Sequence, residues 1–171
     1  MSFRYKMILL LTVFVFVGFF SLQGFAETSD YGAKGALSQS DMDLKAMLTY
    51  AIEDEYLAKA EYELIMDKYG RIRPFSNIVR AEEQHIRYLL ELFNTYGYAI
   101  PADTAKDHVV LPHNLKSAYE TGVQAEIDNI AMYEVFLKRE LPAEVRDVFE
   151  QLKRASENHL GAFKNNLRKY S

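Results

Sequence analysis

Apolar residues recur three and four positions apart in four stretches of the chain, residues 40–69, 74–96, 114–139 and 142–169. This spacing gives a helix one apolar face, which packs against neighbouring helices in a bundle. Gly70 and Gly97 follow the first two stretches, as is typical of helix ends. Pro74 and Pro142 begin the second and fourth stretches, where a first helical turn accepts proline. The sequence therefore predicts an all-α protein built on a four-helix bundle.

The connections between the predicted helices differ in length. Two are short, whereas residues 98–113 separate the second helix from the third with two prolines and no helical pattern. At about 3.3 Å per extended residue, this segment can cross the full length of a bundle. We therefore expect the second and third helices to run parallel, as in one branch of the four-helix bundles. Residues 27–39, which are mostly small or polar, predict a flexible leader before a bundle at 40–171 whose first helix is capped by Ser40.

The predicted helices carry an internal repeat. The segment RAEEQHI, which contains Glu82 and His85, recurs 74 residues later as RASENHL, which contains Ser156 and His159. The first copy holds a Glu-x-x-His pair, whose side chains lie one helical turn apart and can bind one ion together. In the second copy, Ser156 stands in place of the glutamate. The repeat indicates that one helical hairpin occurs twice in the chain.

Polar residues interrupt the apolar face near the middle of every predicted helix. They are Glu55, Glu82, His85, Glu126, Asn129, Ser156 and His159. A glutamate that faces an apolar core must be neutralised, paired or bound to a cation, because leaving it alone there costs several kcal/mol. The distances of these residues from the hairpin turns put them at one height in the bundle. Carboxylate and imidazole ligands suit Fe, Mn or Zn, and the pattern does not choose among these ions.

Two interpretations of this polar layer stay open. In the first, the glutamates and histidines bind metal. In the second, they form a metal-free layer with Ser156 and Asn129 in which each polar group satisfies another. Tyr62 and Tyr133, each seven residues after a core-facing glutamate, either hydrogen-bond the ligands of the opposite helix or are ordinary core residues.

Other polar residues are expected outside the layer. The solvated faces of the helices are predicted to carry Glu53, Asp54, Glu61, Glu63 and Glu83. His108 and His113 fall in the crossover and are not expected to be ligands.

Residues 1–26 are predicted to be a secretory signal peptide. Two basic residues precede an apolar run from Met7 to Phe20, and a small-x-small cleavage site ends at Ala26. A retained membrane anchor is the alternative, because the uncharged stretch approaches the ~20 residues that span a bilayer. Both alternatives place residues 27–171 outside the cytoplasmic membrane, so we expect an exported protein that is periplasmic, extracellular or associated with the cell envelope.

The net charge and the cysteine content limit the binding partners and the metal ligands that the chain can have. The formal net charge of −4 becomes −6 without Arg4 and Lys6. This balance argues against nucleic acid and against an anionic membrane surface as partners. The chain has no cysteine. Thiolate metal sites are thereby excluded, and any metal must take carboxylate and imidazole ligands.

With these motifs the chain resembles the ferritin-like superfamily, whose di-metal carboxylate members supply a glutamate from each of two helices and Glu-x-x-His from the other two. The resemblance covers residues 41–170 and implies a ferritin-like four-helix bundle with a long crossover between helices 2 and 3. Within the superfamily, the chain is similar to exported bacterial and archaeal ferritin-like proteins classed as a domain of unknown function. That similarity rests on Ser156, Asn158, His159, Leu160, Ala162 and Phe163.

The resemblance also implies a ligand set. Glu55 and Glu126 correspond to the single carboxylates, Glu82 and His85 to the intact pair, and His159 to the second imidazole. The serine of the second copy leaves three carboxylates where the superfamily has four, which argues against a complete di-iron centre.

The expected function is that of an exported protein that binds one or two transition-metal ions, with Fe or Mn favoured. The expected ligands are Glu55, Glu82, His85, Glu126 and His159. Oxidase- or peroxidase-type redox activity is a further expectation. The alternative is a metal-free bundle at the cell envelope that binds or scaffolds another molecule. Metal ions are the expected partners, and a homodimer is compatible with the sequence.

Overall fold

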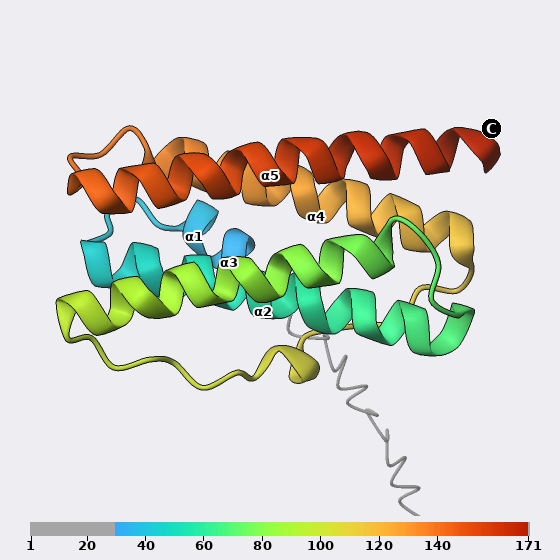
Figure 1. Ribbon diagram of the computed structural model, residues 1–171, viewed down its shortest axis with the longest axis horizontal. Helices are drawn as coiled ribbons and strands as arrows, with labels where there is room; N and C mark the ends of the chain where they lie inside the picture. Colours follow the sequence, from blue (N-terminus) through green and yellow to red (C-terminus); the bar gives the residue numbers. More distant parts are fainter. Residues whose placement is uncertain (1–29, 171) are drawn as a thin grey trace, which may run out of the picture.

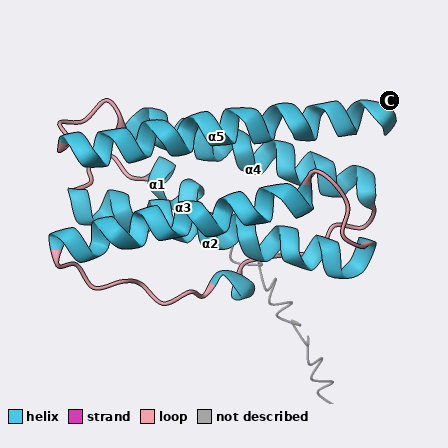
Figure 2. Cartoon of the chain, viewed as in Figure 1, coloured by secondary structure: helices cyan, strands magenta, loops and turns pink. Residues whose placement is uncertain are grey.

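Four long helices form a four-helix bundle in a computed structural model that describes residues 30–170. They are α2 (Leu44–Tyr69), α3 (Phe75–Tyr96), α4 (Leu115–Phe136) and α5 (Ala143–Leu167). A short helix, α1 (Gly32–Ser38), precedes them, and two 3₁₀ turns, η1 (Ala105–Asp107) and η2 (Arg168–Tyr170), follow α3 and α5. Figure 2 shows helices and loops throughout the described residues and no strand. The predicted signal peptide lies outside the described residues.

The crossover runs along the outside of the bundle from the end of α3 to the start of α4 (Figure 1). It returns the chain to the end of the bundle at which α3 began, so α3 and α4 run parallel, while α2–α3 and α4–α5 are antiparallel hairpins. The predicted four-helix bundle with a long crossover between its second and third helices is confirmed.

The helix ends follow the expected chemistry, with one shift. Asp43 caps α2 by accepting a hydrogen bond of 2.8 Å from the backbone N–H of Ala46, so this helix begins later than the predicted cap at Ser40. Gly70 and Gly97 end α2 and α3 with φ values of 87° and 65°, which other residues rarely adopt. These two glycines fix the points at which the chain turns.

The predicted flexible leader at 27–39 is wrong for its described part, because α1 is a helix that packs on α2 and α4. Ala33 and Ala36 of α1 are buried in this contact. Gly35 lets α1 approach this closely, since a Cβ there would lie 2.7 Å from the Tyr50 ring and 2.8 Å from the backbone of Asp30. The small residues that indicated flexibility therefore allow close packing.

Two apolar clusters, one toward each end of the bundle, hold the helices together. One surrounds Leu48 and Phe149, and the other surrounds Phe75 and Phe163. These four side chains are fully buried, and each contributes roughly 1.5–3 kcal/mol by leaving water. All four long helices supply residues to both clusters. The helix segments between the clusters are therefore held firmly on both sides.

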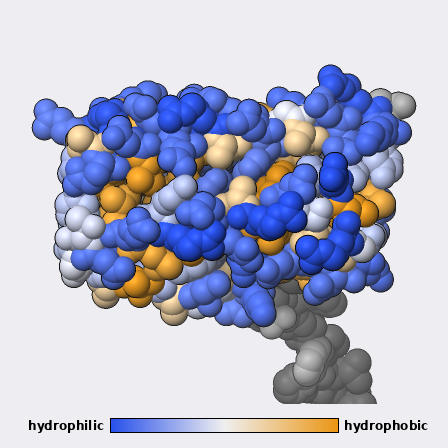
Figure 3. All heavy atoms as spheres, in the orientation of Figure 1, coloured by the Kyte–Doolittle hydropathy of each residue, from blue (hydrophilic) through white to orange (hydrophobic). Residues whose placement is uncertain are grey.

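The outer surface is mainly hydrophilic on the face that Figure 3 shows, with apolar side chains visible between charged ones. Within residues 30–170, no helix combines the length and the hydropathy needed to cross a membrane.

Candidate metal centre

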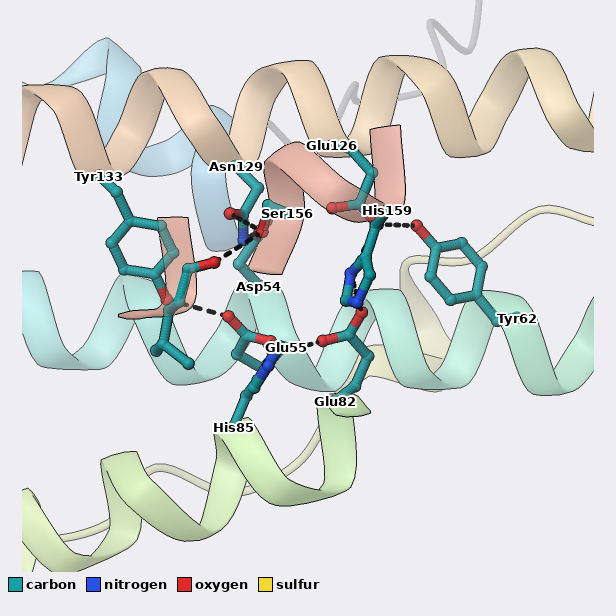
Figure 4. Close-up of polar contacts among 11 residues, drawn as sticks. Asp54, Glu55, Tyr62, Glu82, His85, Glu126, Asn129, Tyr133, Ser156 and His159 are labelled. Carbon is teal, nitrogen blue, oxygen red and sulfur yellow. Dashed lines mark hydrogen bonds and ion pairs between the residues drawn. The ribbon is translucent and has the colours of Figure 1, made fainter. Parts of the chain in front are cut away.

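The middle of the bundle holds the five predicted ligands in one layer between the two apolar clusters (Figure 4). Glu55 comes from α2, Glu82 and His85 come from α3, Glu126 comes from α4, and His159 comes from α5. His159 is partly exposed, with 12% of its side chain accessible, and the other four are buried. The structure thus brings all five side chains together.

The five residues form two overlapping groups that share Glu82. Glu55, Glu82 and His85 make one group, and Glu82, Glu126 and His159 make the other. In each group the donor atoms lie within 4.8 Å of one another. The two imidazole rings stack with their centroids 5.9 Å apart. The arrangement offers two neighbouring positions for a cation, with Glu82 between them.

Short contacts join the members of each group. Nδ1 of His85 lies 2.7 Å from Oε2 of Glu82 and 3.0 Å from Oε2 of Glu55. Nδ1 of His159 lies 3.3 Å from Oε1 of Glu82 and 3.6 Å from Oε1 of Glu126. Each histidine therefore faces one carboxylate from α3 and one from the α2–α4 side of the bundle.

Two buried tyrosines orient the outer carboxylates. Tyr62 on α2 donates a hydrogen bond of 2.9 Å to Glu126 on α4, and Tyr133 on α4 donates one of 2.9 Å to Glu55 on α2. Of the two roles left open for these tyrosines, the structure confirms the hydrogen bond to the opposite helix. Such contacts fix the direction in which a ligand's free oxygen points.

Ser156 belongs to a separate buried chain of hydrogen bonds. Its hydroxyl donates to Oδ1 of Asn129 over 2.7 Å, and Nδ2 of Asn129 donates to Oδ2 of Asp54 over 2.7 Å. The other oxygen of Asp54 accepts a bond of 2.8 Å from the backbone N–H of Ala33 in α1. This Ser156–Asn129–Asp54 chain links α5, α4, α2 and α1 beside the candidate ligands.

The prediction that Asp54 lies on a solvated face is wrong, since it is only 8% exposed. Its carboxylate contacts both Asn129 of α4 and the backbone of α1, which packs on α2. The sequence did not predict this burial of α2, because α1 has no apolar period and so was not predicted to be a helix that covers it. His108 of the crossover stacks on Tyr31 near α1, with ring centroids 4.0 Å apart, and is outside both groups.

Comparison with known proteins identifies the family of this bundle. The sequence pattern of the family named Rubrerythrin matches residues 46–167, which contain all five candidate ligands. The chain belongs to the rubrerythrin family. This membership confirms the predicted ferritin-like superfamily.

An archaeal relative has the same fold. The uncharacterized protein MJ0754 of Methanocaldococcus jannaschii is 28% identical over 138 residues, which cover 69% of this chain and 71% of that protein. A crystal structure of the hypothetical protein MJ0754 from Methanococcus jannaschii matches this fold with a TM-score of 0.67 at 22% identity. The match covers 77% of this chain and 85% of that one.

The charges of this rubrerythrin-family centre are tightly balanced. Burial opposes a positive charge at both histidines, but the adjacent carboxylates outweigh it and raise the pKa of His85 to about 10 and that of His159 to about 9. Burial raises the pKa of Glu55 to about 8. Burial acts in the same direction on Glu82, yet the adjacent imidazoles of His159 and His85 outweigh it and lower its pKa to about 2. Two imidazolium ions thus compensate the carboxylates when no metal is present.

The donor set fits the metal cofactor that the rubrerythrin family implies. Carboxylates and imidazoles are ligands for Fe and Mn. Nδ1 of His159 is buried and makes no well-aligned hydrogen bond with any described residue, although Glu82 is near. A buried nitrogen left without a partner is costly. Once it has lost its proton, this nitrogen could bind a metal ion held by Glu82 and Glu126.

Proposed function

We propose that this protein is an exported ferritin-like metalloprotein that binds one or two ions of Fe or Mn inside the bundle and carries out oxidase- or peroxidase-type redox chemistry. The observation that supports this proposal is the pair of carboxylate–imidazole groups that share Glu82. A single buried glutamate or histidine is weak evidence for a metal site. Two groups of such residues, contributed by four helices at one height, are what a metal-binding site requires.

Each ligand has a defined place in this proposal. Glu55 and His85 would hold one ion, Glu126 and His159 would hold the other, and Glu82 belongs to both groups. A metal bound there would supply the redox chemistry, with these residues holding it in place. The protein orients Glu55 and Glu126 through its two tyrosines. With Ser156 in place of a fourth carboxylate, one side of the pair is open to water or substrate.

Metal analysis of the variant Glu82→Gln tests the proposal. We expect the purified parent protein to retain Fe or Mn after anaerobic loading and desalting, and the variant to lose both ions, because Glu82 belongs to both groups. Added metal should raise the melting temperature of the parent but not that of the variant. The matched control is Glu83→Gln, which removes an exposed carboxylate from the next position and should bind metal as the parent does. A parent protein that retains neither ion would refute the proposal.

The second candidate function is a metal-free envelope bundle that binds or scaffolds another molecule. It is favoured by the Ser156–Asn129–Asp54 chain and by the histidine–carboxylate contacts, which satisfy much of the polar layer without a metal. Under this alternative, a chelator leaves the thermal stability of the protein unchanged. Under the metalloprotein proposal, the chelator lowers it.

Export is proposed from the N-terminal sequence alone. The measurement that tests it is N-terminal sequencing of the protein recovered from the cell envelope or medium of its native host. We expect the mature chain to begin at Glu27. Recovery of the intact N-terminus in an envelope fraction would favour the retained anchor, and recovery in the cytoplasm would refute export.

A further inference from the structure

A cavity of about 170 Å³ lies between α2 and α4 beside the candidate metal centre. Glu82, Glu126 and Ser156 line its inner wall, while Ala33 and Lys34 of α1 line its outer side. A cavity of about 150 Å³ is enough to hold benzene. The space is therefore much larger than dioxygen or peroxide needs, and it suits a molecule with a six-membered ring.

The serine of the second repeat helps to create this space. Ser156 lines the cavity and turns its hydroxyl toward Asn129. A glutamate at the same position, like Glu82 in the first repeat, has a longer side chain that would extend into the cavity. The lost carboxylate and the cavity are thus two results of one substitution.

The wall of the cavity also includes a carboxylate, that of Glu61, without a hydrogen bond or close ion pair among residues 30–170. Glu61 lies on α2 two turns after Asp54 and lines the cavity. The structure records no hydrogen bond or close ion pair between Glu61 and any residue from 30 to 170, whereas both oxygens of Asp54 are satisfied. Burial, and then the charge of Asp54, raises the pKa of Glu61 to about 7 despite the nearby Lys34. Glu61 had been predicted to lie on a solvated face, and it is partly buried there.

Part of the remaining wall is suited to an apolar body, although polar side chains such as Thr121 and Gln124 also line the cavity. Leu57 and Ala58 of α2 and Ala125 of α4 line the cavity together with Glu61 and the candidate ligands. Small side chains at 58 and 125 leave the space open, and an apolar group placed there loses contact with water. A hydrated inorganic ion would gain nothing from these three side chains.

We propose that this cavity is a binding site for a small organic cation, a primary amine with a compact apolar body. The ammonium group lies against Glu61, and the body lies against Ala58 and Ala125. The site goes beyond the proposed metal binding and does not require it. When both are occupied, the amine lies next to Glu82 and Glu126.

Calorimetric titration of the metal-free protein with benzylamine tests the proposal, with benzyl alcohol as the neutral probe of the same shape. We expect one benzylamine per chain and an affinity about tenfold higher than that of benzyl alcohol, as a hydrogen bond to a charged partner would give. In Glu61→Gln, the affinity for benzylamine should fall about tenfold, while that for benzyl alcohol stays the same. The matched control is Glu63→Gln, which removes a more exposed carboxylate paired with Lys59 and should bind as the parent does.

A second variant tests the place of the ligand. Ala125→Leu fills the cavity, so it should abolish binding of both probes, with circular dichroism confirming that the bundle is folded. If this variant does not fold, the comparison of Glu61→Gln with Glu63→Gln still decides. Equal affinities for the amine and the alcohol, no saturable binding, or equal effects of the two glutamine variants would overturn the proposal. Because these titrations use metal-free protein, their failure leaves metal binding untouched, and a failure of metal binding leaves them valid.

Discussion

Ser156 is the residue at which this protein departs from the symmetry of its own repeat. Its hydroxyl belongs to a buried chain that ends on the backbone of α1, so the position has acquired a structural role in place of a carboxylate. The centre keeps three carboxylates, two histidines and two orienting tyrosines. Three carboxylates limit the number of cations that the centre can hold.

Replacing Ser156 with glutamate tests this limit on the number of cations. We expect Ser156→Glu to bind more metal ions per chain than the parent, because a fourth carboxylate offsets the charge of a second divalent ion. The metal-free variant should be less stable by about 1–3 kcal/mol, since Oδ1 of Asn129 loses the hydrogen bond from Ser156 and another carboxylate is buried. Elemental analysis of loaded protein and urea unfolding of metal-free protein measure the two effects. Ser156→Gln has the same size without the charge, so a gain of metal in this control would contradict the explanation.

Among the elements, the four long helices could be predicted from the sequence and α1 could not. Each long helix shows its apolar period over six or more turns, and glycine or proline marks its ends. The five candidate ligands could be predicted for the same reason, because they interrupt that period at one height. The seven residues of α1 are too few to show a period. Asp54 was therefore misplaced and the partial burial of Glu61 was missed, since α1 packs on the face of α2 that carries Asp54.

Gly35 is the residue that allows α1 to dock, and its replacement tests this role. We expect Gly35→Val to lower the free energy of unfolding by about 1–3 kcal/mol, the usual cost of overpacking, because its Cβ would meet Tyr50 and the backbone of Asp30. Hydrogen exchange should increase over residues 32–38, while α2 to α5 stay protected. Gly161→Ala is the control: nothing lies within 4 Å of a Cβ at that position of α5, so this variant should be at least as stable as the parent. Unchanged exchange in Gly35→Val would show that α1 docks without the close approach.

At the scale of the whole molecule, two apolar clusters enclose a layer of charge, and the stability of the metal-free protein should depend on pH through that layer. The pKa of His85 rises from 6.5 to about 10 on folding, and that of His159 rises from 6.5 to about 9. A raised histidine pKa stabilises the folded state fully below pH 6.5, and this contribution disappears as the pH rises through the folded-state pKa. The raised pKa of Glu55, about 8, acts in the same direction, whereas the lowered pKa of Glu82 matters only below about pH 4.5.

We therefore expect the melting temperature of the chelator-treated protein to fall steadily between pH 6.5 and pH 9. Bound Mn should reduce this fall, because the ion replaces the protons of His85 and His159, and the affinity for Mn should rise over the same range as fewer protons have to be displaced. Thermal unfolding under anaerobic conditions, with chelator and with excess Mn, measures both effects. His113→Gln, which alters a histidine of the crossover outside the centre, should reproduce the parent profile. Identical pH profiles with and without Mn would mean that the two histidines do not exchange their protons for metal, and that the charged layer is structural.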